Sequence, residues 1–245
     1  MKPAVFYTLA DEKNMEYALK MQNSLKKFHP DIPHIIYSDK DFWFTEDPKR
    51  LYRMYAVFGE ELSKQYDLVM QIDADSIVTG SLDHIINDTT YEIGGVLNNN
   101  TIDPQISIFC IPPEYYINAG FLAVRSQRFW SWWNKLNYTP YFDNMQFVEQ
   151  DMLNLIFHLG DLKTKIFDMS ENWHGLIHKG LWGQFEMEGD NIVLPENLEQ
   201  EHIMREKKYI KIIHWAGGNV PKLNYQISFK PEVVKRLNYL VGDTK

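Results

Sequence analysis

The chain has 245 residues, 25 Lys and Arg, 33 Asp and Glu, and a formal net charge of −8. This balance excludes the broad basic face that a duplex nucleic-acid binder needs, so we expect no nucleic-acid partner. A hydrophobic content of 44% is typical of a globular protein and argues against disorder. Cys110 is the single cysteine, which excludes an intrachain disulfide and a cysteine-rich zinc site.

The sequence shows no feature that would direct or anchor the chain to a membrane. No apolar run approaches the roughly 20 residues that span a bilayer, and the first residues lack the apolar segment and cleavage site of a signal peptide. We therefore expect no transmembrane segment and a cytoplasmic protein; the alternative is a fragment of a membrane-tethered protein. The sequence does not indicate an oligomeric state.

The first 75 residues alternate between strand and helix patterns. Apolar, β-rich runs predict strands at 5–9, 34–37 and 67–72, and apolar residues at helical spacing predict helices over 14–28 and 47–64. This alternation predicts a parallel, Rossmann-like sheet with right-handed crossovers. Neither a Gly-x-Gly-x-x-Gly nor a Walker A sequence occurs, so we expect any bound phosphate to be held without a glycine-rich loop of these types.

The second half of the chain is less regular. The same patterns predict strands at 91–97, 121–124, 165–169 and 209–214, helices over 81–86, 127–137, 144–159 and 231–242, and a loop region at 98–117. No internal repeat or flexible linker interrupts these elements. We therefore expect one α/β domain rather than two.

Two carboxylates end the third predicted strand. Asp73 and Asp75 follow the run 67–72 with one small residue between them. Ligands of parallel sheets bind beyond the carboxyl ends of strands, and side chains two apart on an extended chain point the same way. Because two close carboxylates repel each other, we expect Asp73 and Asp75 to face one Mg²⁺, Mn²⁺ or Ca²⁺ ion. The alternative is that they only form a turn.

A histidine ends another apolar strand. We interpret His214, which follows 210–213, as a third ligand of the same ion, and its nitrogen favours Mn²⁺ over Mg²⁺. Gly217 would let backbone N–H groups approach a phosphate closely, and Lys222 is a candidate phosphate contact. The alternative for His214 is a buried structural histidine.

Four motifs occur in a fixed order along the chain: Asp73-Ala74-Asp75, Asn118-Ala119-Gly120, Glu149-Gln150-Asp151 and His214-Trp215-Ala216-Gly217. This series resembles the GT-A glycosyltransferases, most closely the family 8 group that includes glycogenin and bacterial galactosyltransferases. The resemblance implies a single GT-A-like α/β domain over 1–245, with a mostly parallel sheet flanked by helices. It implies a nucleotide-binding half at 1–97, and at 98–245 an acceptor-binding half whose C-terminal region completes the metal site.

The resemblance also implies the ligands of the donor. Asp73, Asp75 and His214 would bind Mn²⁺, with Mg²⁺ as the alternative, and the ion would grip the diphosphate of a nucleotide sugar, usually a UDP-sugar. Ala74 would meet the ribose through its backbone, and Arg53 resembles the basic residue that contacts donor phosphate or sugar.

Other positions match family contacts with the base and the sugar. Thr8, Ala10 and Asp11, at the exit of the first strand, resemble the edge that binds uracil. Asn118 and Gly120 match the motif beside the donor sugar. Glu149 and Gln150 match the pair next to the anomeric carbon.

The sequence departs from the family pattern at two of these places. Glu149 stands where the family usually has Asp, and Val220 stands at the usual spacing of the late lysine, so that Lys222 comes two residues beyond it. The implied reaction is transfer of a hexose to a hydroxyl acceptor with retention of anomeric configuration. The alternatives are a non-catalytic nucleotide-sugar or carbohydrate binder and a sugar nucleotidyltransferase. The latter usually has a glycine-rich loop near the first strand, where residues 8–14 contain no glycine.

Overall fold

The computed structural model describes residues 3–41, 50–98, 111, 115–140, 142, 148–174, 183–195, 207–215 and 229–243. The helices are α1 (Met15–Phe28), α2 (Arg50–Ser63), α3 (Asp83–Ile86), α4 (Gln127–Leu136), α6 (Val148–Leu159) and α7 (Pro231–Val241), with short 3-10 turns η1 (Asp39–Asp41) and η4 (Met169–Asn172). The strands are β1 (Val5–Ala10), β2 (His34–Ser38), β3 (Val69–Ile72), β4 (Ser76–Val78), β5 (Ile93–Leu97), β6 (Ile117–Val124), β7 (Thr164–Phe167), β8 (Trp173–His174), β9 (Glu186–Glu188), β10 (Asn191–Leu194), β11 (Lys208–Tyr209) and β12 (Ile212–His214). None of the described helices is long and apolar enough to span a membrane.

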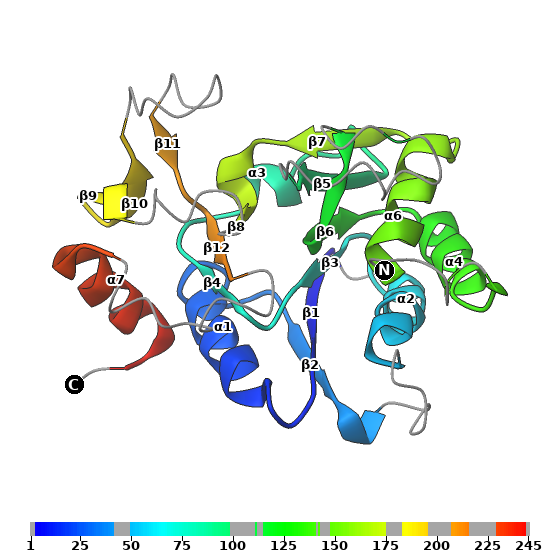
Figure 1. The fold of residues 1–245 in the computed structure, drawn as a ribbon, viewed down its shortest axis with the longest axis horizontal. Coiled ribbons are helices and arrows are strands. Elements are labelled where there is room, and N and C mark those ends of the chain that lie inside the picture. The colour runs from blue at the N-terminus through cyan, green and yellow to red at the C-terminus, as the bar shows by residue number, and fades with distance from the viewer. Residues whose placement is uncertain are drawn as a thin grey trace.

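A six-stranded sheet in the order β2-β1-β3-β6-β5-β7 forms the centre of the molecule (Figure 1). Strand β1 pairs in parallel with β2 and β3, and β5 pairs in parallel with β7. Only β6 is reversed within this sheet, because it is antiparallel to both β3 and β5. The predicted parallel arrangement of the first three strands is therefore confirmed.

The two faces of the central sheet are covered by different helices. Alternate side chains of β1 point to opposite faces: Tyr7 packs in a core with residues of α2, α4 and α6, whereas Phe6 packs with Met21 and Leu25 of α1. The aromatic side chains that α4 directs to the first core include Trp130 and Trp133, which are fully buried.

Helices α2 and α4 approach each other closely at a glycine. A Cβ atom at Gly59 of α2 would lie 2.3 Å from Cε3 of the Trp130 indole, well inside van der Waals contact. The indole therefore occupies the space that a side chain at this position would need.

The C-terminal part of the chain adds a second, smaller core beside the sheet. Strands β4, β12 and β8 form a three-stranded sheet, β11, β10 and β9 form another, and residues of α7 pack with them in one cluster. The strand predicted at 209–214 is instead two short strands, since β11 pairs with β10 and β12 pairs with β4 and β8. This change of partner carries the end of β12 to the turn after β3.

Candidate metal centre

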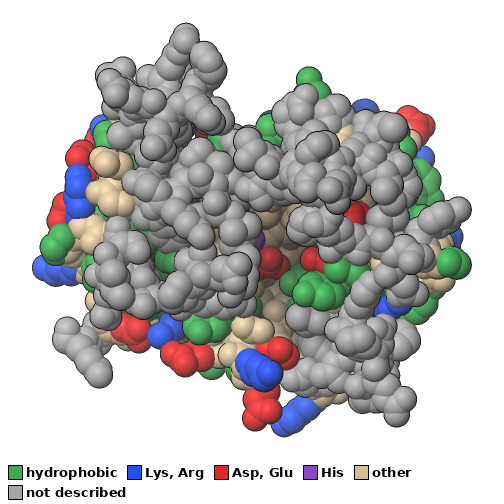
Figure 2. Space-filling view, viewed as in Figure 1, with side chains coloured by type: hydrophobic (Ala, Val, Ile, Leu, Met, Phe, Trp, Pro, Cys, Tyr) green, Lys and Arg blue, Asp and Glu red, His purple; other side chains and the backbone are tan. Residues whose placement is uncertain are grey.

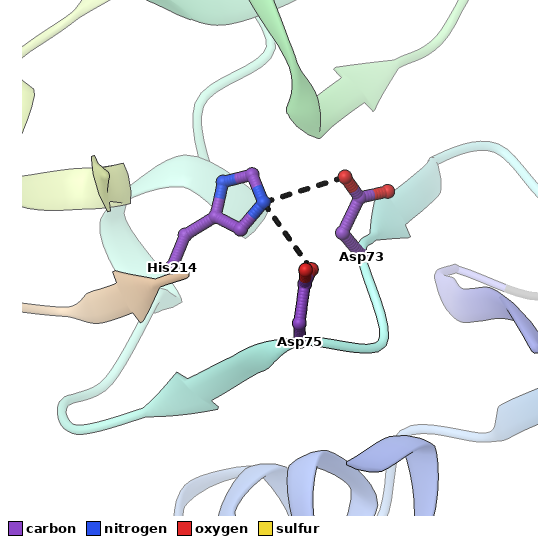
Figure 3. A group of neighbouring side chains, drawn as sticks. All are labelled: Asp73, Asp75 and His214. Atoms are coloured by element: carbon purple, nitrogen blue, oxygen red, sulfur yellow. Dashed lines mark ion pairs between the residues drawn. The ribbon is translucent and has the colours of Figure 1, made fainter. Parts of the chain in front are cut away.

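The three predicted metal ligands lie together at the carboxyl end of β3 (Figure 3). Nε2 of His214 is 3.4 Å from Oδ2 of Asp73 and 3.4 Å from Oδ1 of Asp75. One ligand atom from each residue lies within 4.8 Å of the other two, and this is the one such group of His, Cys, Asp or Glu in the part of the chain that the structure describes. The structure thus brings together residues that are far apart in the sequence.

Pairing between β4 and β12 explains why these side chains meet. The strands are antiparallel with His214 opposite Ser76, and the backbone N–H of Trp215 donates to the carbonyl oxygen of Asp75 at 2.9 Å. The prediction that Asp73 and Asp75 share an extended segment was wrong, because residues 74–75 form a turn. The chain leaves the central sheet at this turn, and the two carboxylates converge on the imidazole from opposite ends of the turn.

The charges of the site are arranged around a buried imidazole. The side chain of His214 is 3% exposed, whereas those of Asp73 and Asp75 are 25% and 13% exposed. Burial alone lowers the pKa of His214, but hydrogen bonds to both carboxylates and their charges outweigh burial and raise this pKa to about 9. At neutral pH a proton therefore supplies the positive charge between the carboxylates. Two carboxylate oxygens and one imidazole nitrogen are donors that suit a divalent ion such as Mn²⁺, so the residues fit the implied metal.

Gly120 makes room for the imidazole. A Cβ atom at this position would lie 2.1 Å from Cε1 and 2.4 Å from Nδ1 of His214. The carbonyl oxygen of Gly120 also accepts a hydrogen bond from the backbone N–H of Asp73 at 3.0 Å. The backbone of β6 therefore touches the predicted metal ligands directly, and only glycine permits this approach.

Asn118 holds the same stretch of β6 through its side-chain amide. Its Oδ1 accepts from the Gly120 N–H at 2.8 Å and from Nδ2 of Asn172 at 3.0 Å, and its Nδ2 donates to Oδ1 of Asn98 at 2.8 Å. All three asparagines are buried. Asn98 and Asn172 were not predicted as site residues, and their bonds hold the Asn118 side chain beside Gly120 and the predicted metal ligands.

Helix α6 is fixed to the start of β6 by two amide side chains one helical turn apart. Oε1 of Gln150 accepts from the Ala119 N–H at 2.9 Å. Oδ1 of Asn154 accepts from the Ile117 N–H at 2.6 Å, and its Nδ2 donates to the Ile117 carbonyl at 2.9 Å. These bonds set the position of the first turn of α6, which carries Glu149.

Glu149 is a partly buried residue whose Oε2 is buried, and its carboxyl group interacts electrostatically with Asp73. Burial raises the pKa of Glu149 well above its ordinary value, and the charges of Asp73 and Asp151 raise it further. Its Oε2 has no hydrogen-bond partner among the described residues. Asp151 itself accepts a short hydrogen bond from the hydroxyl of Tyr116.

The exit of β1 lies against the turn that carries the aspartates. Ala10 and Ala74 belong to one small apolar cluster, so the predicted nucleoside contacts are neighbours in space. Thr8 is fully buried and donates its hydroxyl to the Ile72 carbonyl at 2.8 Å. Asp11 accepts from the backbone N–H of Asn14 at 2.9 Å.

Of the three residues predicted to contact the diphosphate, the structure describes only Arg53. The guanidinium of Arg53 lies over the Phe142 ring, 4.2 Å from its centre. Gly217 and Lys222 lie outside the described residues. Figure 2 shows a histidine and acidic side chains gathered near the middle of one face of the molecule.

Comparison with solved structures finds glycosyltransferases across nearly the whole chain. The galactosyltransferase LgtC, solved with donor and acceptor sugar analogues, superposes with a TM-score of 0.61 and 13% identity over 98% of this chain and 96% of that one. The bifunctional glycosyltransferase WbbM superposes with a TM-score of 0.62 and 12% identity over 98% of this chain and 50% of that one. A glycosyltransferase involved in glycosylation of the major capsid of PBCV-1 superposes with a TM-score of 0.56 and 9% identity. This match covers 96% of this chain and 98% of that one.

The sequence itself gives no comparable match. No protein-family model matches the chain, and no curated protein matches it by sequence. The likeness therefore lies in the fold, and the α/β arrangement predicted from the four motifs is confirmed. The chain has the GT-A fold of these glycosyltransferases.

Proposed function

We propose that the protein is a metal-dependent glycosyltransferase that moves a hexose from a nucleotide sugar, a UDP-sugar, to a hydroxyl group of a glycan or other acceptor. The observation that carries this proposal is the convergence of Asp73, Asp75 and His214 at the carboxyl end of a central strand, where parallel sheets bind ligands. The fold of LgtC, a galactosyltransferase solved with donor and acceptor analogues, supports it.

The donor set favours Mn²⁺ as the ion, with Mg²⁺ as the alternative, because it combines carboxylate oxygens with an imidazole nitrogen. When bound, the ion would offset the negative charge that develops on the leaving diphosphate. His214 would bind the ion as the neutral imidazole, which requires that its proton leave first. We assign further contacts with the diphosphate to Arg53, Gly217 and Lys222.

The nucleoside would lie along the exit of β1. We assign Asp11 to the base and the Ala74 backbone to the ribose. Thr8 and Ala10 are fully buried, so we assign them to the support of this edge and not to direct contact with the base. Contact between Ala10 and Ala74 in one cluster supports this assignment. Residues 1–97 would then form the nucleotide-binding half, and 98–245 the acceptor-binding half that also supplies His214.

In the reaction, the bond between the anomeric carbon and the diphosphate oxygen breaks, and a bond from that carbon to the acceptor oxygen forms. The acceptor hydroxyl proton is released. Positive charge develops at the anomeric carbon, and an adjacent carboxyl or amide oxygen stabilises it. We assign this role to Glu149 and Gln150, and placement of the sugar to Asn118 and Gly120. We propose retention of anomeric configuration, on the resemblance to family 8.

Release of UDP from UDP-sugars tests the proposal. We expect the purified protein to release UDP from at least one UDP-hexose when Mn²⁺ is present, and Asp75→Ala to reduce the rate at least 100-fold because it removes one of three ligands. The matched control is Asp67→Ala, since Asp67 is an exposed aspartate just before β3, and its rate should not change.

Two outcomes would contradict the proposal in different ways. A UDP-sugar that raises the melting temperature with Mn²⁺ but is never cleaved, with any acceptor, would indicate the non-catalytic binder. Full activity in folded Asp75→Ala would refute the metal assignment.

A further inference from the structure

Asp73 accepts two hydrogen bonds on the carboxylate oxygen that does not face His214. Its Oδ1 receives the hydroxyl of Tyr55 at 2.9 Å and Nε2 of Gln71 at 2.8 Å. Its Oδ2 is the atom that faces Nε2 of His214. Both donors are buried, where hydrogen bonds to a charged acceptor are strong. The two oxygens of this carboxylate therefore have separate tasks.

Gln71 is unusual for a residue of a central strand. It is 1% exposed, lies in the otherwise apolar strand β3 (Val69–Ile72), and projects to the same face as Asp73, two residues later. Its amide nitrogen must face Asp73, because its carbonyl oxygen there would repel the carboxylate. Its Oε1 has no hydrogen-bond partner among the described residues, and this costs stability that an apolar residue would not lose.

Tyr55 reaches the same oxygen from α2. Burial raises the pKa of its hydroxyl well above the ordinary value, and the charges of Asp73 and Glu149 raise it further, so the hydroxyl remains a donor. The hydroxyl of Tyr7 donates to the backbone carbonyl of Tyr55 at 2.8 Å and thereby holds this turn of α2 against β1.

We propose that Tyr55 and Gln71 are positioning residues that fix the Asp73 carboxylate so that Oδ2 is presented to a divalent cation shared with Asp75 and His214. With both bonds in place, rotation of the carboxylate is opposed by two donors, and the ion does not have to order this ligand when it binds. The inference rests on the proposed function and extends it from the ligands to the residues that orient one of them.

Mn²⁺ alone, titrated into the purified full chain and followed by the electron paramagnetic resonance signal of free Mn²⁺, tests the proposal without an assay of turnover. We expect Tyr55→Phe and Gln71→Met each to weaken Mn²⁺ binding about tenfold, as removal of such supporting bonds does in other metal sites. The double variant should bind Mn²⁺ more weakly than either single variant.

Matched controls separate positioning from loss of packing. Tyr91→Phe removes a buried tyrosine hydroxyl that donates to the Ile85 carbonyl, and Gln22→Met removes an amide that contacts His34. Both variants should keep the Mn²⁺ affinity within about twofold even if the melting temperature falls. If Tyr55→Phe and Gln71→Met remain folded and bind Mn²⁺ like the unchanged protein, the positioning role is wrong. If the unchanged protein itself binds no Mn²⁺, the proposed function fails instead.

Discussion

At the scale of single residues, Gly120 connects the backbone of β6 to the imidazole of His214. We expect Gly120→Ala to displace the imidazole, because the added Cβ would lie 2.1 Å from Cε1 of His214 and 2.8 Å from Oδ1 of Asn118. Mn²⁺ affinity, measured by calorimetric titration, should fall at least tenfold.

Gly95→Ala is the control for this substitution. It also lies in the central sheet, but its Cβ would meet the Ile117 side chain, 2.6 Å from Cγ2, and not His214. The control should lose some stability and keep its Mn²⁺ affinity. Equal losses of affinity in both variants would show that general distortion of the sheet, and not contact with His214, is responsible.

Sequence patterns predict some of the site residues and not others. Asp73, Asp75 and His214 could be predicted because each comes at the polar end of an apolar strand. Tyr55 and Gln71 could not, because the helical pattern shows which face is buried but not which buried atom will meet a carboxylate. A glutamine inside an apolar strand, on the same face as the aspartate two residues later, was the one available signal.

At the scale of secondary-structure elements, the contact between α2 and α4 opposes the usual preference for alanine in helices. In an exposed helix, alanine is more stabilising than glycine by about 1 kcal/mol. At position 59, however, a Cβ would overlap the Trp130 indole. We expect Gly59→Ala to lower the free energy of unfolding by about 1–3 kcal/mol, measured by urea denaturation.

A double-mutant cycle tests the reason for that loss. In a Trp130→Leu background the obstruction is gone, so the same alanine should be neutral or stabilising. An equally large loss in both backgrounds would place its origin outside the contact with the indole.

Strand β6 shows where the sequence stops predicting an element. The apolar pattern predicts a strand only from 121, because Asn118 and Gly120 interrupt the pattern before that point. The strand in the structure begins at Ile117. The backbone groups of that early segment are bonded by Gln150 and Asn154 of α6, a tertiary contact that periodicity does not reveal. Since β6 is reversed, its beginning and not its end lies beside the carboxyl end of β3.

At the scale of the whole molecule, the partly buried His34 and the buried His214 should give the metal-free protein opposite pH dependences of stability. Burial lowers the pKa of His34 to about 4, so stability is lost as pH falls from about 6.5 through 4, where the unfolded chain binds the extra proton. The pKa of His214 is about 9, so its contribution is complete below about 6.5 and is lost as pH rises through 9.

Urea denaturation at a series of pH values, with a chelator present, measures this dependence. Each histidine alone should give a limiting slope of about 1.4 kcal/mol per pH unit, with greatest stability near neutral pH. His34→Gln should flatten the acid limb and His214→Gln the alkaline limb. A stability that stays constant between pH 5 and 9 would be inconsistent with both histidine environments.

The raised pKa of His214 has a consequence for how an ion enters the trio of ligands. At neutral pH His214 already carries a proton that interacts with Asp73 and Asp75. A cation that binds there would have to displace this proton. Uptake is then a substitution that acidifies the surrounding solution, and an acid environment competes with it by mass action. The three side chains that would bind the ion thus hold a proton that offsets part of their negative charge until the ion arrives.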